Sequence, residues 1–342
     1  MNLTRRAMRM AGAVMVLAGI GATLPALSQG TAAGSTAKKQ VNLAFFGYSA
    51  ANAYTQAALL GVKDVAKKYG ASVTVYTPTA TATKQEAQVE DAATSGKFNG
   101  MVVYSVSGDA VVPGVKEAIA KGIKVVADFV AIGPTINAIK PQVKGLSGSV
   151  IAPIDETGTA SGDLVVKACT GIDPCHVVYL TGTAKLPLTV DRTDHFMAVI
   201  KKHANIHIVG TITGGYTSSK GYAAGEDALS AHPTVNVIAS PADQAIVGVE
   251  EAVKQAGDLK KVKLIGGGGT YQAIAGLKSG DWFGTVNYCP TREAERATRI
   301  DIQAVLGQKV KQPYVNSLTL CGAPLELTKS NVGSYKGEWT AG

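Results

Sequence analysis

The sequence lacks the features that mark several common classes of protein. It has five histidines in 342 residues, and none of them stands in a recognisable catalytic triad motif. Its net charge is +8, but no run of lysine and arginine is long enough for a nucleic-acid footprint. Beyond residue 28, no apolar stretch approaches the roughly 18 residues of a membrane helix, so we expect the mature protein to be soluble.

Residues 1–28 have the pattern of an export signal. Three arginines come before an apolar run over 11–24, and a small-x-small cleavage site ends at Ser28. The paired Arg5 and Arg6 fit the twin-arginine route, but ordinary secretory signals also carry such pairs, so the route stays open. Because this segment has no cysteine, we exclude a lipid anchor and expect a free periplasmic protein. Cleavage near Ser28 leaves a net charge of about +5.

The chain has only four cysteines, an even number that suits an oxidising compartment. Cys169 and Cys175 bracket a turn-rich segment that can close a small loop, which leaves Cys289 and Cys321 as the second pair. A metal site is the alternative, but the neighbouring Cys175 and His176 would point to opposite faces of a strand. We therefore expect two structural disulfides, no metal and no cofactor.

The rest of the chain alternates between short β-rich runs and stretches with helical periodicity. This order predicts an α/β protein with parallel sheets covered on both faces, in which each half is a doubly wound, Rossmann-like lobe. The predicted strands are residues 41–46, 73–76, 100–104, 124–128, 148–151, 176–180, 207–212, 235–240, 262–266 and 284–288. The predicted helices are residues 54–68, 84–95, 109–121, 156–168, 190–203, 219–231, 243–255 and 292–306.

A change in the pattern near residues 145–154 indicates the boundary between the two lobes. An extended segment with glycine, serine and proline stands there, before a second set of strand–helix units. Residues 29–40, which are rich in small residues, are predicted to be a flexible leader. Ligands of such sheets bind at the carboxyl ends of the strands, so two facing lobes predict one shared cleft.

Five stretches of the sequence, in order, resemble landmarks of one family, the periplasmic sugar-binding proteins of ABC transporters (type I, the ribose-binding-protein group). The resemblance runs from Val41 to about Val332. The matching stretches are residues 41–46 with Gly61 in the next helix, 121–128 ("GIPVV-x-x-D"), 154–164 ("x-D-N-x-x-x-G"), 192–196 ("R-x-x-G-F") and 324–332 ("P-x-x-L-V-T-K-x-N-V").

The resemblance implies that three segments cross between the lobes and form a hinge. The crossings would lie near residues 152–154, 288–290 and 321–324, so a disulfide between Cys289 and Cys321 would join two of them. The implied N-terminal lobe is 41–152 plus 289–322, and the implied C-terminal lobe is 153–288 plus 323–335.

The resemblance also implies which residues bind the ligand. Sugar sites need side chains that make several hydrogen bonds and aromatic rings that stack on the sugar. The alternative for each position is a local structural role, such as helix capping by Asn52 or a turn for Asp128. The candidates are Ser49, Asn52, Tyr54, Ser107, Asp128, Phe129, Arg192, Tyr216, Asp243, Gly268 and Tyr288.

Several positions depart from the family pattern. Gly268 stands in place of a ligand-binding aspartate, Ala242 in place of an asparagine, and Tyr288 in place of a hinge glutamine. Phe129 replaces the usual arginine, and Ser107 replaces an aspartate. These changes predict a cleft that is larger, less anionic and more aromatic than that of a simple sugar binder.

The leading hypothesis is therefore the periplasmic solute-binding component of an ABC importer. The protein would capture a sugar or sugar-like ligand in the cleft, close by hinge bending, and deliver the ligand to a membrane permease as a monomer. Alternatives are a bulkier or aromatic ligand that is not a sugar, or a sensor that reports to a chemoreceptor or kinase. An exported enzyme is disfavoured, since no nucleophile–base motif stands out.

Overall fold

The computed structural model describes residues 39–77 and 81–342. The predicted export signal and nearly all of the predicted leader lie outside these residues. Within the described part of the chain, no helix is long and apolar enough to cross a membrane.

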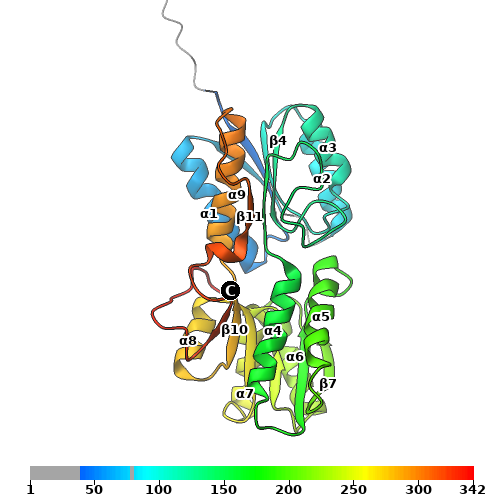
Figure 1. The fold of residues 1–342 in the computed structure, drawn as a ribbon, viewed down its shortest axis with the longest axis vertical. Coiled ribbons are helices and arrows are strands. Elements are labelled where there is room, and N and C mark those ends of the chain that lie inside the picture. The colour runs from blue at the N-terminus through cyan, green and yellow to red at the C-terminus, as the bar shows by residue number, and fades with distance from the viewer. Residues whose placement is uncertain (1–38, 78–80) are drawn as a thin grey trace, which may run out of the picture. The chain divides into compact units, whose positions relative to one another are not determined.

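The described residues form two sheets of six strands each (Figure 1). The first sheet has the order β11-β5-β4-β3-β1-β2, and the second has the order β12-β10-β9-β8-β6-β7. All neighbouring strands are parallel except β10 and β12. The strands are β1 Asn42–Phe46, β2 Ser72–Tyr76, β3 Gly100–Tyr104, β4 Lys124–Phe129, β5 Gly148–Ile151, β6 Cys175–Thr181, β7 Ile206–Thr213, β8 Val237–Ala239, β9 Lys263–Gly268, β10 Gly284–Asn287, β11 Tyr314–Asn316 and β12 Glu326–Thr328.

Helices cover both faces of each sheet, as alternation along the buried strands requires. In the first sheet, α1 and α9 cover one face, and α2 and α3 cover the other (Figure 1). Phe45 packs with α1 and α9, whereas its neighbours Ala44 and Phe46 pack with α2 and α3. In the second sheet, α4 and α5 cover one face, and α6, α7 and α8 cover the other. The helices are α1 Ala53–Tyr69, α2 Ala82–Thr94, α3 Val112–Ala120, α4 Ile154–Ala168, α5 Pro187–Ile200, α6 Ser218–Ala231, α7 Asp243–Gln255, α8 Tyr271–Ser279 and α9 Pro290–Val305, with a 3-10 turn η1 at Ser317–Leu320.

The prediction of two doubly wound α/β lobes is confirmed. Every predicted strand and helix is present with ends shifted by a few residues, but α8, β11 and β12 were missed. The strands β11 and β12 have only three residues each, whereas α8 has nine, as many as the predicted α3. The helix predicted from residue 109 begins later, at Val112. Asp109 accordingly does not cap it, and Val111 holds the cap position instead.

The chain passes between the two sheets at three places: from β5 to α4, from β10 to α9, and from η1 to β12. The disulfide Cys289–Cys321 joins the second and third of these passages. Cys169–Cys175 closes the turn between α4 and β6. Both predicted pairings are confirmed.

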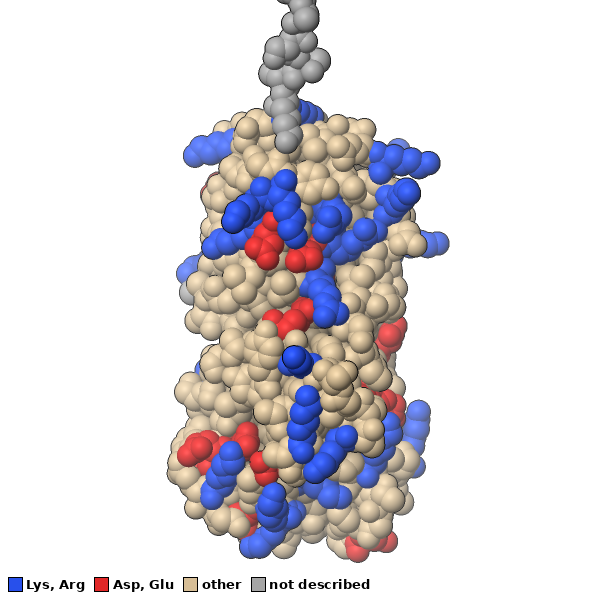
Figure 2. Space-filling model, turned by 90° about the vertical axis from the view of Figure 1, so that its left-hand side faces the viewer, with Lys and Arg blue, Asp and Glu red and all other residues tan. Residues whose placement is uncertain are grey.

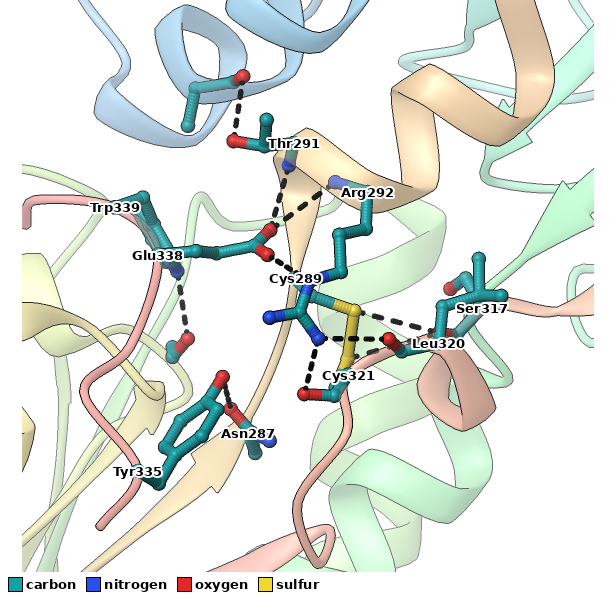
Figure 3. A network of polar contacts seen from close by, with 12 residues as sticks. Asn287, Cys289, Thr291, Arg292, Ser317, Leu320, Cys321, Tyr335, Glu338 and Trp339 are labelled. Carbon is teal, nitrogen blue, oxygen red and sulfur yellow. Dashed lines mark hydrogen bonds and ion pairs between the residues drawn. A yellow bond between two sulfur atoms is a disulfide. The ribbon is translucent and has the colours of Figure 1, made fainter. Parts of the chain in front are cut away.

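The segment 334–342, which we call the C-terminal strap, returns to the passages between the sheets. Glu338 accepts hydrogen bonds from the backbone N–H groups of Thr291 (3.0 Å) and Arg292 (3.3 Å) at the start of α9 (Figure 3). Its other oxygen lies 3.0 Å from Nε of Arg292. A carboxylate at a helix N-terminus also interacts favourably with the helix dipole, so Glu338 anchors the strap to α9.

Two aromatic residues attach the C-terminal strap to the second sheet. Nε1 of Trp339 donates to the carbonyl oxygen of Gly268 (2.9 Å), at the end of β9 (Figure 3). The hydroxyl of Tyr335 donates to Oδ1 of Asn287 (3.1 Å), at the end of β10. The strap therefore binds the second sheet at the ends of two strands and binds α9, which packs on the first sheet.

The exposed surface carries charges of both signs. Figure 2 shows lysine and arginine side chains distributed over one face, with acidic side chains between them. Exposed ion pairs such as Lys260–Asp281 (2.9 Å) and Lys121–Glu117 (3.1 Å) contribute little stability each.

Candidate functional site

A pocket lies where the carboxyl ends of the strands of the two sheets face each other. Its walls come from both lobes: β1, β3 and β4 end on one side, and β7, β8, β9 and β10 end on the other. The lining residues are Tyr48, Asn52, Tyr54, Tyr104, Phe129, Leu188, Arg192, Tyr216, Pro241, Ala242, Gln244, Gly267, Tyr288 and Trp339.

Aromatic rings dominate this pocket. The described part of the chain supplies seven aromatic lining residues, and most of them contact one another. Tyr54 is central, with ring centroids 4.9 Å from Phe129, 5.4 Å from Trp339 and 5.9 Å from Tyr104. Such rings present flat apolar faces with hydroxyls at the edge, which suits a ring-shaped ligand.

The two lobes touch across this pocket. The hydroxyl of Tyr48 lies 2.9 Å from Oγ1 of Thr183, and its ring meets Tyr216 edge-on with centroids 5.9 Å apart. Nδ2 of Asn137 donates to Asp191 (3.1 Å). The remaining cavity is about 40 Å³, space for a few water molecules, so the structure has a closed cleft.

The backbone of Phe129 is in the left-handed region, with φ of 61°. A bulky residue there costs roughly 1–3 kcal/mol, and such conformations cluster at functional sites. The strain directs the Phe129 ring into the pocket at the end of β4.

Arg192 projects from α5 into the same pocket and is 3% exposed. Its Nε donates to Oγ1 of Thr157 (3.2 Å). The guanidinium carbon lies 5.8 Å from the centre of the Tyr288 ring, within the range of a cation–π contact. The charge is thus held between α4, α5 and the end of β10.

The structure brings six of the candidate ligand residues to the pocket and leaves five outside it. Asn52 has two roles, since it lines the pocket and its Oδ1 accepts from the backbone N–H of Thr55 (3.0 Å) as the cap of α1. The lining candidates are Asn52, Tyr54, Phe129, Arg192, Tyr216 and Tyr288, and those outside the lining are Ser49, Ser107, Asp128, Asp243 and Gly268.

Asp128 is fully buried beside the pocket, next to Phe129 in β4. Neither of its carboxylate oxygens has a hydrogen-bond partner, and its buried neighbour Glu293 accepts from the Tyr54 hydroxyl (2.9 Å). Burial raises the pKa of Asp128 to about 8. Burial also raises the pKa of Glu293 well above its ordinary value, and the charge of Asp128 raises it further. Burial thus disfavours the charged form of both carboxyl groups.

Stability should depend on pH through this pair. The pKa of Asp128 is raised from 3.8 to about 8, so the folded state keeps a proton that the unfolded state releases. The contribution of Asp128 to the free energy of unfolding should then be fully present below about pH 4 and be lost as the pH rises toward 8. We expect Asp128→Asn to flatten this fall in chemical unfolding at pH 5 and pH 8. The exposed Asp64→Asn is the matched control, and an unchanged profile in Asp128→Asn would disprove this origin.

Asp243 has a structural role at the start of α7. Its oxygens accept from the hydroxyls of Thr285 (2.8 Å) and Thr270 (2.9 Å), and from the backbone N–H of Thr270 (3.0 Å). Burial raises the pKa of Asp243 to about 6 although these hydrogen bonds lower it. The carboxylate holds β9 and β10 together and does not reach the pocket.

Gly268 does not line the pocket, and its lack of a side chain leaves space for Asp243 and Trp339. A Cβ atom there would lie 2.5 Å from Oδ2 of Asp243 and 3.0 Å from Cζ2 of Trp339. Trp339 thus occupies space beside the position where the family's aspartate would stand. The expectation of a less anionic and more aromatic cleft agrees with this lining, in which Trp339 and the tyrosines take much of the space. The expectation of a larger cleft stays a prediction.

Sequence reasoning missed several lining residues. Tyr104 ends a predicted strand and Tyr48 follows another, so the rule that ligands bind at strand ends could have found both. Trp339 gave no such signal, because it lies beyond the region of family resemblance. Ala242 was noted only as a departure from the family pattern, and the missed lining residues are Tyr48, Tyr104, Leu188, Pro241, Gln244, Gly267 and Trp339.

Comparison with known proteins gives one consistent result. A family model for a periplasmic binding protein domain matches residues 43–309. The ribose import binding protein RbsB of Salmonella typhimurium is 23% identical over 261 residues, which cover 76% of this chain and 83% of that protein. The galactofuranose-binding protein YtfQ of Escherichia coli is 33% identical over 103 residues, which cover 29% of this chain and 32% of YtfQ.

Solved structures share the fold. A periplasmic solute-binding protein of an ABC transporter from Actinobacillus succinogenes, with bound D-allose, has a TM-score of 0.73 at 19% identity. The match covers 86% of this chain and all of that one. A solute-binding protein from Mycobacterium smegmatis with bound glycerol has the same TM-score at 23% identity, and covers 87% of this chain and 98% of that one.

Proposed function

From the premise that this chain belongs to the periplasmic binding protein domain family, we propose that it is the solute-binding component of an ABC importer. It captures a small ring-shaped solute, a sugar or sugar-like compound, in the pocket between its lobes. Closure of the lobes then presents the loaded protein to a membrane permease.

The observation that carries this proposal is the position of the pocket. Seven aromatic rings and one arginine converge where facing strand ends meet, and three chain passages connect the lobes beside them. A hinge of this kind lets the lobes part to admit a ligand and then close around it. Binding then favours the closed form, provided that the ligand contacts both lobes. The sugars named for the relatives support a ring-shaped solute.

The composition of the lining favours binding over catalysis. Among the described residues that line the pocket, none is serine, threonine, cysteine, histidine, aspartate or glutamate. A hydrolase would need a nucleophile with a base, or paired carboxylates.

Localisation and organisation complete the proposal. We place the protein in the periplasm as a free monomer, with its signal removed near Ser28 and with no nucleic-acid partner. The proposed lobes are 41–152 plus 289–322, and 153–288 plus 323–335. The C-terminal strap extends the second lobe to residue 342 through its bonds to β9 and β10.

A pair of tyrosine variants tests the proposed function. Ribose, galactose, allose, myo-inositol and related ring compounds are screened against the mature protein by thermal shift. We expect at least one compound to raise the melting temperature and to bind in calorimetry. Tyr216→Ala should abolish this shift with little loss of stability, because Tyr216 is only half-buried and lines the pocket. Tyr314→Ala should keep it, because Tyr314 is 46% exposed on β11. Equal loss in both variants, or no binding of any compound, would contradict the proposal.

A further inference from the structure

The pocket holds a positive charge that the protein does not neutralise. Arg192 is the one charged side chain among the described residues of the lining. It takes part in none of the ion pairs found between described residues, and it is 3% exposed. Its Nε bonds to a neutral hydroxyl, that of Thr157. Burying a charge without a counter-charge is unfavourable, and in this arrangement no negative charge of the described residues is paired with Arg192.

The acidic groups nearest the pocket do not supply a counter-charge for Arg192. Asp243 directs both oxygens to hydroxyls and backbone N–H groups between β9 and β10. Asp128 and Glu293 lie outside the lining and form no ion pair with Arg192, and burial raises the pKa of both, which disfavours their charged forms. The groups that face Arg192 directly are tyrosines, with the Tyr288 ring 5.8 Å away.

Apart from its tyrosine hydroxyls, the rest of the lining has few side-chain acceptors for a neutral polyol. A sugar with several hydroxyls needs acceptors, usually carboxylates and amides. Of the two amide side chains in the lining, Asn52 already uses its oxygen to cap α1. Gln244 is the other. By contrast, flat aromatic faces are abundant, and they bind a ring whether or not it carries hydroxyls.

We infer, as a refinement that rests on the proposed function, that this pocket takes a small ring compound that carries one carboxylate. The ring packs against the tyrosines and Trp339, and the carboxylate accepts a forked pair of hydrogen bonds from the Arg192 guanidinium. The negative charge of the bound carboxylate offsets the unfavourable free energy of burying the Arg192 guanidinium. A sugar acid and an aromatic acid share this chemistry.

Matched pairs of ligands test the inference. Galacturonate is compared with galactose, and 4-hydroxybenzoate with 4-hydroxybenzyl alcohol, by calorimetry on the mature protein at pH 7. We expect at least one acid to bind tenfold or more tightly than its neutral partner. If only galacturonate binds more tightly than its neutral partner, the ligand class is a sugar acid. If only 4-hydroxybenzoate does so, the ligand class is an aromatic acid.

Two variants separate the charge of Arg192 from its packing. Arg192→Gln should remove the preference for the acid, whereas Arg192→Lys should keep part of it. If Arg192→Gln does not fold, the ligand pairs on the wild-type protein still decide. Galactose or another neutral sugar binding as tightly as its acid would overturn the inference and leave the proposed function intact. No binding of any acid or neutral ring compound would overturn both.

Discussion

Removal of the Cys289–Cys321 disulfide is expected to lower the free energy of unfolding by about 3–4 kcal/mol. The bridge spans 32 residues of sequence, and a crosslink of this length removes much of the freedom of the unfolded chain. Because both cysteines are buried, alanine is the suitable replacement, since a serine hydroxyl would need a new partner. The double variant Cys289→Ala/Cys321→Ala should therefore unfold at lower denaturant under non-reducing conditions.

The second disulfide is an internal control. Cys169 and Cys175 are only six residues apart, so Cys169→Ala/Cys175→Ala should cost less, about 2 kcal/mol. Circular dichroism in urea measures both losses. A loss for the short bridge that equals or exceeds that for the long one would contradict the loop-length argument. Scattering with and without ligand would show in addition whether the Cys289–Cys321 variant still closes.

Replacement of Trp339 by alanine should affect stability and ligand binding together. The side chain is 3% exposed, donates to Gly268, and meets the Tyr54 ring edge-on at 5.4 Å. Loss of a buried tryptophan typically costs about 3–5 kcal/mol. Because Trp339 also forms a wall of the pocket, Trp339→Ala should weaken the best ligand of the screen tenfold or more.

The chain offers a matched control, since Trp282 is its other tryptophan. Trp282 is 2% exposed, packs in the core beneath α7 and α8, and donates to Glu250 (2.9 Å). Trp282→Ala should cost similar stability but leave the ligand dissociation constant unchanged. In Trp282→Phe, the remaining tryptophan fluorescence should respond to ligand. If Trp339→Ala bound ligand as the wild type does, Trp339 would be a structural residue only.

Local sequence signals were enough to predict most of the architecture. Strands such as 100–104 and 124–128 are apolar runs between turn signals, and helices such as α7 carry strong amphipathic periodicity, so both were predicted closely. The disulfides followed from cysteine spacing. The three-residue strands β11 and β12 are too short to show any period.

The candidate site was predicted less completely, and for a physical reason. Tyr54, in the first turn of α1, and Phe129, at the end of β4, were predicted through the family resemblance. Whether a carboxylate there faces the ligand or the core depends on tertiary packing, which turned Asp128 away from the lining. The position of Trp339 in the pocket is harder to predict from sequence, because it depends on a contact with Gly268, a residue 71 positions earlier that leaves space for the indole.

The disulfide between two of the three interlobe passages also defines how the lobes can move. Three independent connections would allow the lobes to bend, twist and slide. A covalent link between the second and third passages removes their independent displacement, so we expect these two passages to move together when the lobes bend. With two of its three connections joined, the pair of lobes has fewer ways to move, and we expect opening of the pocket to be mainly a bending about these passages.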